Sequence, residues 1–228
     1  MKKIIFAFIL LSSFNAYAEN DFCTHTLNIN EDSDIVDSLL SDKNYSYKNT
    51  NGKLCFMSDE GIVLALMLKN GKTSGNIEFT VYYERNKPML QMYFSDYRAL
   101  SMLGELVNES NGNINLSALK EYQLNITYTF FYENGNTYFK ASIKNGNGSI
   151  TLYEENGAMA SFRPIKNYQF NGTAEVYSEN GRLWATLTYK DGEVIAGKCV
   201  NERKNGSEWT KAEISNWENG LEVDCSYF

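Results

Sequence analysis

A short tripeptide, Glu-Asn-Gly, recurs in the second half of the chain and constrains the fold more than any other feature. Its four copies end at Gly135, Gly157, Gly181 and Gly220. The first three are 22 and 24 residues apart, the period of a repeat array. The last interval is 39, which suggests an insertion or an irregular terminal unit. A second set of turns alternates with them: Asn145-Gly146, Asn171-Gly172, Asp191-Gly192 and Asn205-Gly206. Such pairs supply the positive φ angles of tight hairpin turns, so the pattern predicts a series of β-hairpins.

The segments between these turns alternate between apolar and polar residues. The alternation is clearest over 124–132, 137–143 and 183–189. A two-residue period is typical of half-buried strands, and the enrichment in Tyr, Phe, Thr and Ile fits strands as well. The sequence therefore predicts a mainly β fold, in which stacked hairpins pair into one long antiparallel sheet with one to three short covering helices.

The repeat unit resembles a known family. The best copy covers 173–197, a second covers 145–166, and a degenerate copy covers 69–90, where the turn glycine is replaced by Asn86-Lys87. This pattern is similar to the MORN-variant repeat of the YwqK-type "antitoxin" proteins, and the clear resemblance covers about 128–197. It implies a sheet of stacked hairpins with an assembly or binding role, and it brings no catalytic residues. A cytosolic antitoxin role conflicts with the export signal described next.

The N-terminus reads as a secretory signal peptide over 1–18. Lys2 and Lys3 precede the apolar run IIFAFILL, and Ala16-Tyr17-Ala18 forms a cleavage signal. The apolar run is too short to span about 30 Å of hydrocarbon. Cleavage after Ala18 would lower the net charge from −7 to −9. We therefore expect an exported bacterial protein, either periplasmic or secreted.

The four cysteines are expected to form disulfides in an exported chain. Cys23, Cys55, Cys199 and Cys225 allow three pairings. The contacts of a repeat chain are local, which favours Cys23–Cys55 with Cys199–Cys225, one clamp at each end. The alternative that joins Cys23 to Cys225 stays open at this point. The C-x-x-C spacing of metal or redox sites does not occur in the sequence.

Three segments carry an amphipathic helical pattern: 31–42, 96–108 and 116–122. The polar stretch 109–115 suggests a boundary between an N-terminal β region with degenerate repeats (19–122) and the clear repeat array (123–228). We expect the two regions to be continuous rather than independent.

Composition excludes several classes of protein. An aromatic content of 14% argues against disorder, and the acidic balance argues against a nucleic-acid binder and against attraction to anionic lipids. A single histidine, His25, excludes a zinc site with two or three His ligands and has no partner suggested by the sequence. We predict no catalytic residue, cofactor or metal site.

The glutamates of the Glu-Asn-Gly copies form a regularly spaced acidic series: Glu133, Glu155, Glu179 and Glu218. They could meet a basic partner protein. The alternative, which the sequence favours, is that a turn simply prefers polar residues.

Four aromatic residues are expected on the strand face opposite the more apolar positions: Tyr82, Phe131, Tyr138 and Trp184. They could stack on sugars or peptides, or form cross-strand ladders that stiffen a single-layer sheet, the reading we favour. Together these features suggest an exported, non-enzymatic protein-binding or scaffold module, including an immunity-like protein that masks a basic toxin. The alternative is a cell-envelope glycan-binding module or a glycan-active enzyme.

Overall fold

The computed structural model describes residues 23–41, 45–59, 61–84, 87–94, 114–200, 207–219 and 223–225. The predicted signal peptide, the predicted helix over 96–108 and the predicted turn at Asn205-Gly206 lie outside these residues.

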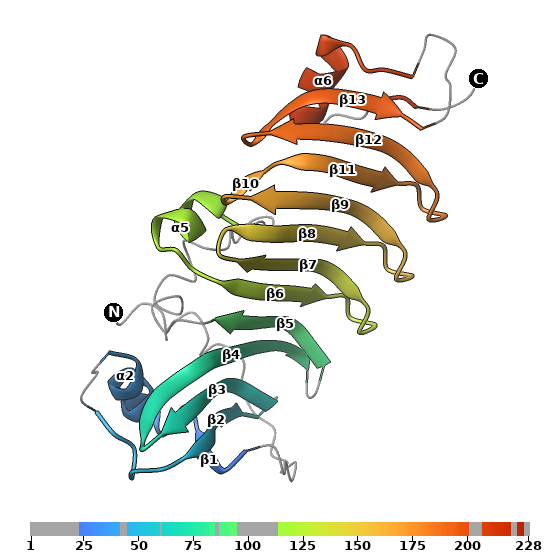
Figure 1. Ribbon diagram of the computed structural model, residues 1–228. Coiled ribbons are helices and arrows are strands. Elements are labelled where there is room, and N and C mark those ends of the chain that lie inside the picture. Colours follow the sequence, from blue (N-terminus) through green and yellow to red (C-terminus); the bar gives the residue numbers. More distant parts are fainter. Residues whose placement is uncertain are drawn as a thin grey trace.

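The described strands form one 13-stranded sheet in which successive strands pair, except that β10 and β11 both pair with β9 (Figure 1). The strands are β1 (His25–Asn28), β2 (Gly52–Ser58), β3 (Gly61–Lys69), β4 (Lys72–Glu84), β5 (Lys87–Phe94), β6 (Ile126–Phe131), β7 (Thr137–Lys144), β8 (Asn147–Tyr153), β9 (Met159–Lys166), β10 (Gln169–Phe170), β11 (Gly172–Tyr177), β12 (Leu183–Lys190) and β13 (Glu193–Cys199). The predicted mainly β sheet of successive antiparallel hairpins is confirmed at this level. One pairing differs, because β1 lies parallel to β2.

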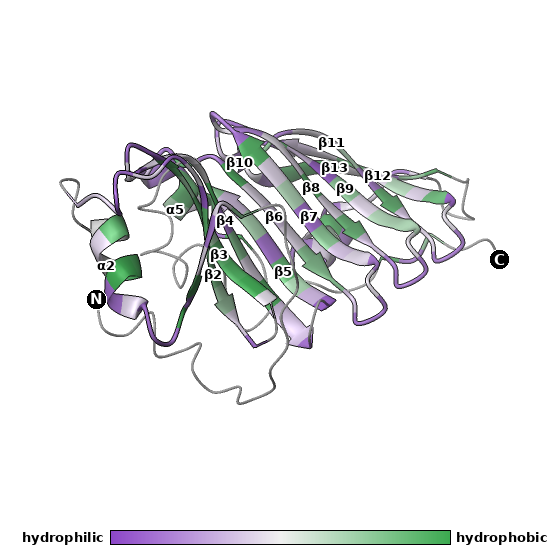
Figure 2. Cartoon of the chain, turned by 90° about the horizontal axis from the view of Figure 1, so that it is seen from below, coloured by the Kyte–Doolittle hydropathy of each residue, from purple (hydrophilic) through white to green (hydrophobic). Residues whose placement is uncertain are grey.

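One face of the sheet, called the inner face, carries the hydrophobic core. The strand register aligns one row of residues across β2 to β7: Leu54, Leu66, Ile77, Phe94, Ile126 and Ile143. These six are at most 3% exposed. A second row contains Phe56, Leu64, Phe79, Met92, Tyr128, Ala141 and Ile150. Figure 2 shows hydrophobic residues recurring along the strands and hydrophilic residues in the connecting loops. The predicted alternation is thus confirmed: every second residue of these strands points to the inner face, where its side chain is buried away from water.

Two helices confirm sequence predictions. Helix α2 (Ser33–Ser41) falls within the predicted 31–42, and α5 (Leu116–Glu121) falls within 116–122. Both contribute buried side chains to the larger core, among them Val36 and Leu119. The Asn115 side chain caps α5 by accepting a hydrogen bond from the backbone N–H of Ala118 at 3.1 Å.

A third helix, α6 (Lys211–Glu218), corrects the sequence analysis. The fourth Glu-Asn-Gly copy was expected to be a hairpin turn, but its Glu218 ends this helix. The reason is a capping box: the Thr210 hydroxyl accepts from the backbone N–H of Glu213, and the Glu213 carboxylate accepts from the backbone N–H of Thr210. A well-capped helix therefore replaces the turn.

Two-residue turns connect strands at one edge of the sheet. Both residues of Asn145–Gly146 and of Asp191–Gly192 have positive φ, as type I′ hairpin turns require. The turn predicted at Asn171-Gly172 is wrong in position. It lies at Asn167–Tyr168, because β10 pairs back onto β9 and Gly172 begins β11.

Gly146 and Gly192 offer a matched pair of substitutions. A Cβ on Gly192 would meet no atom within 4 Å, whereas a Cβ on Gly146 would lie 2.8 Å from the Tyr168 ring. We expect Gly192→Ala to lower the free energy of unfolding by about 1 kcal/mol through its positive φ. Gly146→Ala should cost at least about 1 kcal/mol more, because the ring must move. Urea unfolding measures both, and equal losses would contradict the packing of Tyr168 on this turn.

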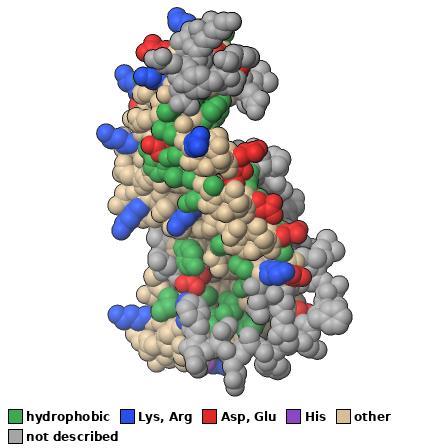
Figure 3. Space-filling view, turned by 90° about the vertical axis from the view of Figure 1, so that its right-hand side faces the viewer, with side chains coloured by type: hydrophobic (Ala, Val, Ile, Leu, Met, Phe, Trp, Pro, Cys, Tyr) green, Lys and Arg blue, Asp and Glu red, His purple; other side chains and the backbone are tan. Residues whose placement is uncertain are grey.

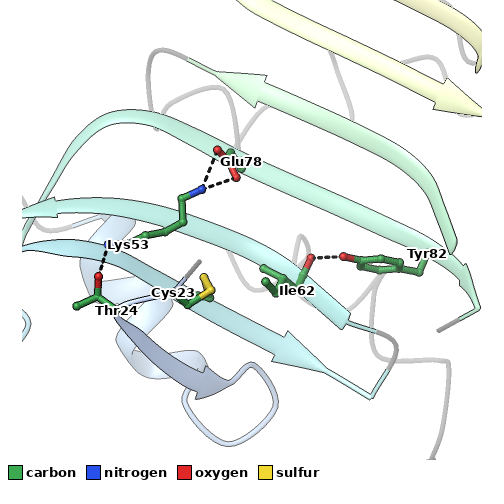
Figure 4. Close-up of a disulfide and its surroundings, with 7 residues drawn as sticks. Cys23, Thr24, Lys53, Ile62, Glu78 and Tyr82 are labelled. Carbon is green, nitrogen blue, oxygen red and sulfur yellow. Dashed lines mark hydrogen bonds and ion pairs between the residues drawn. A yellow bond between two sulfur atoms is a disulfide. The ribbon is translucent and has the colours of Figure 1, made fainter. Parts of the chain in front are cut away.

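Two disulfides form in the predicted local pairing, and one lies at each end of the sheet. Cys23 bonds Cys55 of β2, and Cys199 of β13 bonds Cys225. Figure 4 shows the surroundings of Cys23, where Lys53 Nζ lies 2.9 Å from Glu78 Oε2. Two structural disulfides are typical of an oxidising, extracytoplasmic setting. Among the described helices, none is long and apolar enough to cross a membrane.

Candidate functional site

The first three Glu-Asn-Gly loops lie at one edge of the sheet, opposite the two-residue turns (Figure 1). The loops 132–136, 154–158 and 178–182 connect β6 to β7, β8 to β9 and β11 to β12. We call these three loops the hairpin edge. Because strands lie about 4.8 Å apart, loops two strands apart repeat at about 10 Å. The structure therefore places Glu133, Glu155 and Glu179 in one row, and Glu218 elsewhere, on α6.

The three loops share one hydrogen-bond pattern. In the first, Gly135 N–H donates to the Tyr132 carbonyl at 2.9 Å, and Asn136 N–H donates to Asn134 Oδ1 at 2.8 Å. The second and third loops repeat both bonds. The three glycines have φ of 88°, 86° and 76°. Turn geometry thus explains the Asn and the Gly. It does not require the Glu, whose side chain is exposed in every copy.

Each of these hairpins also contains a β-bulge just after its loop. The register shifts leave one residue of each strand without a partner opposite: Tyr138, Ala160 and Trp184. A bulge shifts the alternation of side chains by one residue. Tyr138 therefore packs against the inner-face ring of Phe130, with 6.0 Å between centroids, and Trp184 packs against the core cluster that contains Trp209, 6.5 Å from that ring. The expectation that Tyr138 and Trp184 lie opposite the apolar positions is wrong for this reason.

The other two aromatic candidates are engaged within the sheet. The Tyr82 hydroxyl donates to the Ile62 carbonyl at 3.0 Å (Figure 4), and burial raises the pKa of Tyr82. Phe131 is partly buried, and its carbonyl accepts a hydrogen bond from the Tyr83 hydroxyl at 2.9 Å. The four aromatic residues therefore do not form one common platform, and Tyr138, 39% exposed, is the most open large aromatic at the hairpin edge.

Hydrogen bonds between hairpins hold the first two loops together. The Tyr132 hydroxyl donates to the Tyr153 carbonyl at 2.9 Å. The Asn134 and Asn136 side-chain amides both donate to the Glu155 carbonyl, at 3.1 and 2.8 Å. These bonds fix the position of one loop relative to the next. Sequence reasoning missed them, and no fixed repeat position signals them: Tyr132 lies three residues before its loop glycine, whereas Tyr153 and Tyr177 lie four residues before theirs.

The hairpin edge is negatively charged. Figure 3 looks onto this side and shows acidic side chains following one another along the molecule, with hydrophobic side chains and a few basic ones beside them. Burial raises the pKa of Tyr132, and the charges of Glu154 and Glu155 add to this effect. Burial and then the charge of Glu133 likewise raise the pKa of Tyr83. The same field would favour a positively charged group bound from solvent.

His25 lies on β1, the first strand of the sheet, with its ring 6.3 Å from that of Tyr47. Across the described ranges, no three His, Cys, Asp or Glu side chains converge where they could hold a metal ion.

Comparison with known proteins gives no family for this chain. No protein-family model matches it, and no curated protein is significantly similar to it.

Proposed function

We propose that the protein is an exported, non-enzymatic binding module that docks a basic protein along its hairpin edge. The observation that carries this proposal is the exposed glutamate in each of the three loops. The loop hydrogen bonds use the Asn and the Gly, so the repeated Glu is left for another role.

Charge and rigidity both support protein docking. The chain has a net charge of −7, and an acidic surface accelerates association with a basic partner. The first two loops are tied to each other, so little conformational freedom is lost when a partner binds them. Tyrosine beside the charges suits an interface because its ring is apolar and its hydroxyl is polar. The resemblance of the repeats to MORN-variant repeats favours the same kind of role.

The test compares two variants with the same change in charge. One is E133Q/E155Q/E179Q at the hairpin edge, and the control is E31Q/E121Q/E193Q, whose three glutamates are exposed elsewhere. Wild-type and variant proteins are immobilised and exposed to a periplasmic extract, and the retained proteins are identified by mass spectrometry. Association rates are then measured with the purified partner at low and high salt.

We expect wild type and control to retain the same basic protein, and the edge variant to associate about tenfold more slowly at low salt. The difference should shrink at high salt, because exposed charges are screened. If the edge variant binds as fast as the control at low salt, or if the retained partner is acidic, the proposal is wrong.

A further inference from the structure

Two polar residues interrupt the apolar inner face on β9. The register places Ser161 between Leu152 and Val176, and it places Arg163 opposite Ile150. All three of these neighbours are apolar. This position separates the larger core cluster from a second cluster formed by β11 to β13, α6 and the C-terminal disulfide. Burying the polar groups of a serine and an arginine on an apolar face is unfavourable unless they gain partners, so their presence here needs an explanation.

The Arg163 guanidinium contacts aromatic rings but no acid. Its central carbon lies 5.9 Å from the ring centroid of Phe170 and 6.0 Å from that of Trp217. Within the described part of the chain, no carboxylate or carbonyl forms an ion pair or hydrogen bond with it. Two rings beside a planar guanidinium hold it in place and leave its N–H fork available for a ligand.

Ser161 adds a second, independent signal. Its side chain is 5% exposed, and its Oγ has no hydrogen-bond partner in the described structure. Buried hydroxyls nearly always have a partner, so the unpartnered Ser161 Oγ keeps a hydrogen-bonding capacity that a bound group would use. Residues two apart on a strand lie about 7 Å from each other on the same face, which one small ligand can span.

We propose that Arg163 and Ser161 form a binding site for a carboxylate group carried on a compact ring, as in an acidic sugar. The site offers a single positive charge and one neutral hydroxyl, which match the charge of −1 on a carboxylate. A phosphate dianion would keep an uncompensated charge on a protein whose net charge is already −7. The rings of Phe170 and Trp217 provide apolar surface for the rest of the ligand. This site is independent of the hairpin edge.

The probes are D-glucuronate, acetate and inorganic phosphate, and binding to the full chain is measured by titration calorimetry. The variants are Arg163→Gln, Arg163→Lys and Ser161→Ala, with Arg182→Gln as the control because Arg182 is exposed in a hairpin-edge loop. Far-UV circular dichroism checks that each variant folds. If the glutamine variant does not fold, the lysine variant decides the test, because Lys keeps the charge and loses the bidentate fork.

We expect wild type to bind glucuronate, and Arg163→Gln to weaken this binding by at least about tenfold. Arg163→Lys and Ser161→Ala should weaken it severalfold, and Arg182→Gln should leave it unchanged. Tighter binding of glucuronate than of acetate supports an acidic sugar, and equal binding supports recognition of the carboxylate alone. The proposal is overturned if neither carboxylate binds, if Arg163→Gln and Arg163→Lys bind as wild type does, or if phosphate binds more tightly than both carboxylates.

Discussion

Replacing Tyr128 by alanine is expected to lower the free energy of unfolding by about 3–5 kcal/mol, among the largest effects of any single substitution in this chain. Tyr128 is 1% exposed and lies on the inner face between Met92 and Ala141. Its ring meets that of Phe139 edge-on, with 5.4 Å between centroids. Truncation leaves a cavity in the middle of a row that joins most of the strands, and a sheet built from paired neighbours cannot collapse to fill it. Urea unfolding followed by circular dichroism measures the loss.

Tyr128→Phe is the matched control, because it keeps the ring and removes only the hydroxyl. It should cost little at neutral pH, and it should differ from wild type at alkaline pH. Burial raises the pKa of Tyr128 from 10.0 to about 12 in the folded protein. Because the folded pKa is the higher one, this contribution to stability is complete below pH 10 and is lost as the pH rises from 10 to 12. Wild type should therefore lose stability more steeply over that range than Tyr128→Phe. Identical alkaline profiles, or a loss below about 1 kcal/mol for Tyr128→Ala, would contradict the burial of this residue.

The sheet could be predicted because its order is set by local rules. Asn-Gly and Asp-Gly fix tight turns, and two-residue alternation fixes the inner face. Each hairpin then has only its neighbours to pair with. Residues 126–130 illustrate this, since Ile126 and Tyr128 are buried as their alternation requires. The cysteine pairing follows from the same locality.

The candidate sites could not be predicted with the same success, because they depend on departures from those rules. The bulges at Tyr138 and Trp184 reverse the expected direction of the side chains, and nothing in simple alternation signals an extra residue. The surroundings of Arg163 could not be predicted for a related reason: its neighbours Phe170 and Trp217 come from other elements, and only the fold brings the three together. Helix α6 is different, because the Thr210-x-x-Glu213 pattern of its capping box is present in the sequence, although the fourth Glu-Asn-Gly copy points to a turn.

The C-terminal disulfide is expected to stabilise the second core cluster in particular. Cys199→Ala with Cys225→Ala should lower the free energy of unfolding by about 3 kcal/mol, since the two cysteines are 26 residues apart and their bond restricts the unfolded chain. The loss of stability should be greatest in the second core cluster, next to the disulfide. Cys199 is fully buried and accepts a hydrogen bond from Trp209 Nε1 at 3.3 Å. The disulfide also holds Val223, which is 2% exposed, against the same cluster.

Tryptophan fluorescence can separate this effect from general destabilisation. All three tryptophans of the chain, Trp184, Trp209 and Trp217, lie in or against the second cluster, so their emission reports on that end of the sheet. The control is Cys23→Ala with Cys55→Ala, which opens the other clamp over a separation of 32 residues. In the C-terminal variant, we expect the midpoint of the fluorescence transition to lie at a lower urea concentration than the midpoint of the circular dichroism transition. In the N-terminal variant, we expect the circular dichroism midpoint to be the lower one. If both signals shift together in both variants, the two clusters unfold as one unit and the prediction of local loss is wrong. The paired strands would then couple the two ends of the sheet more strongly than each disulfide stabilises its own cluster.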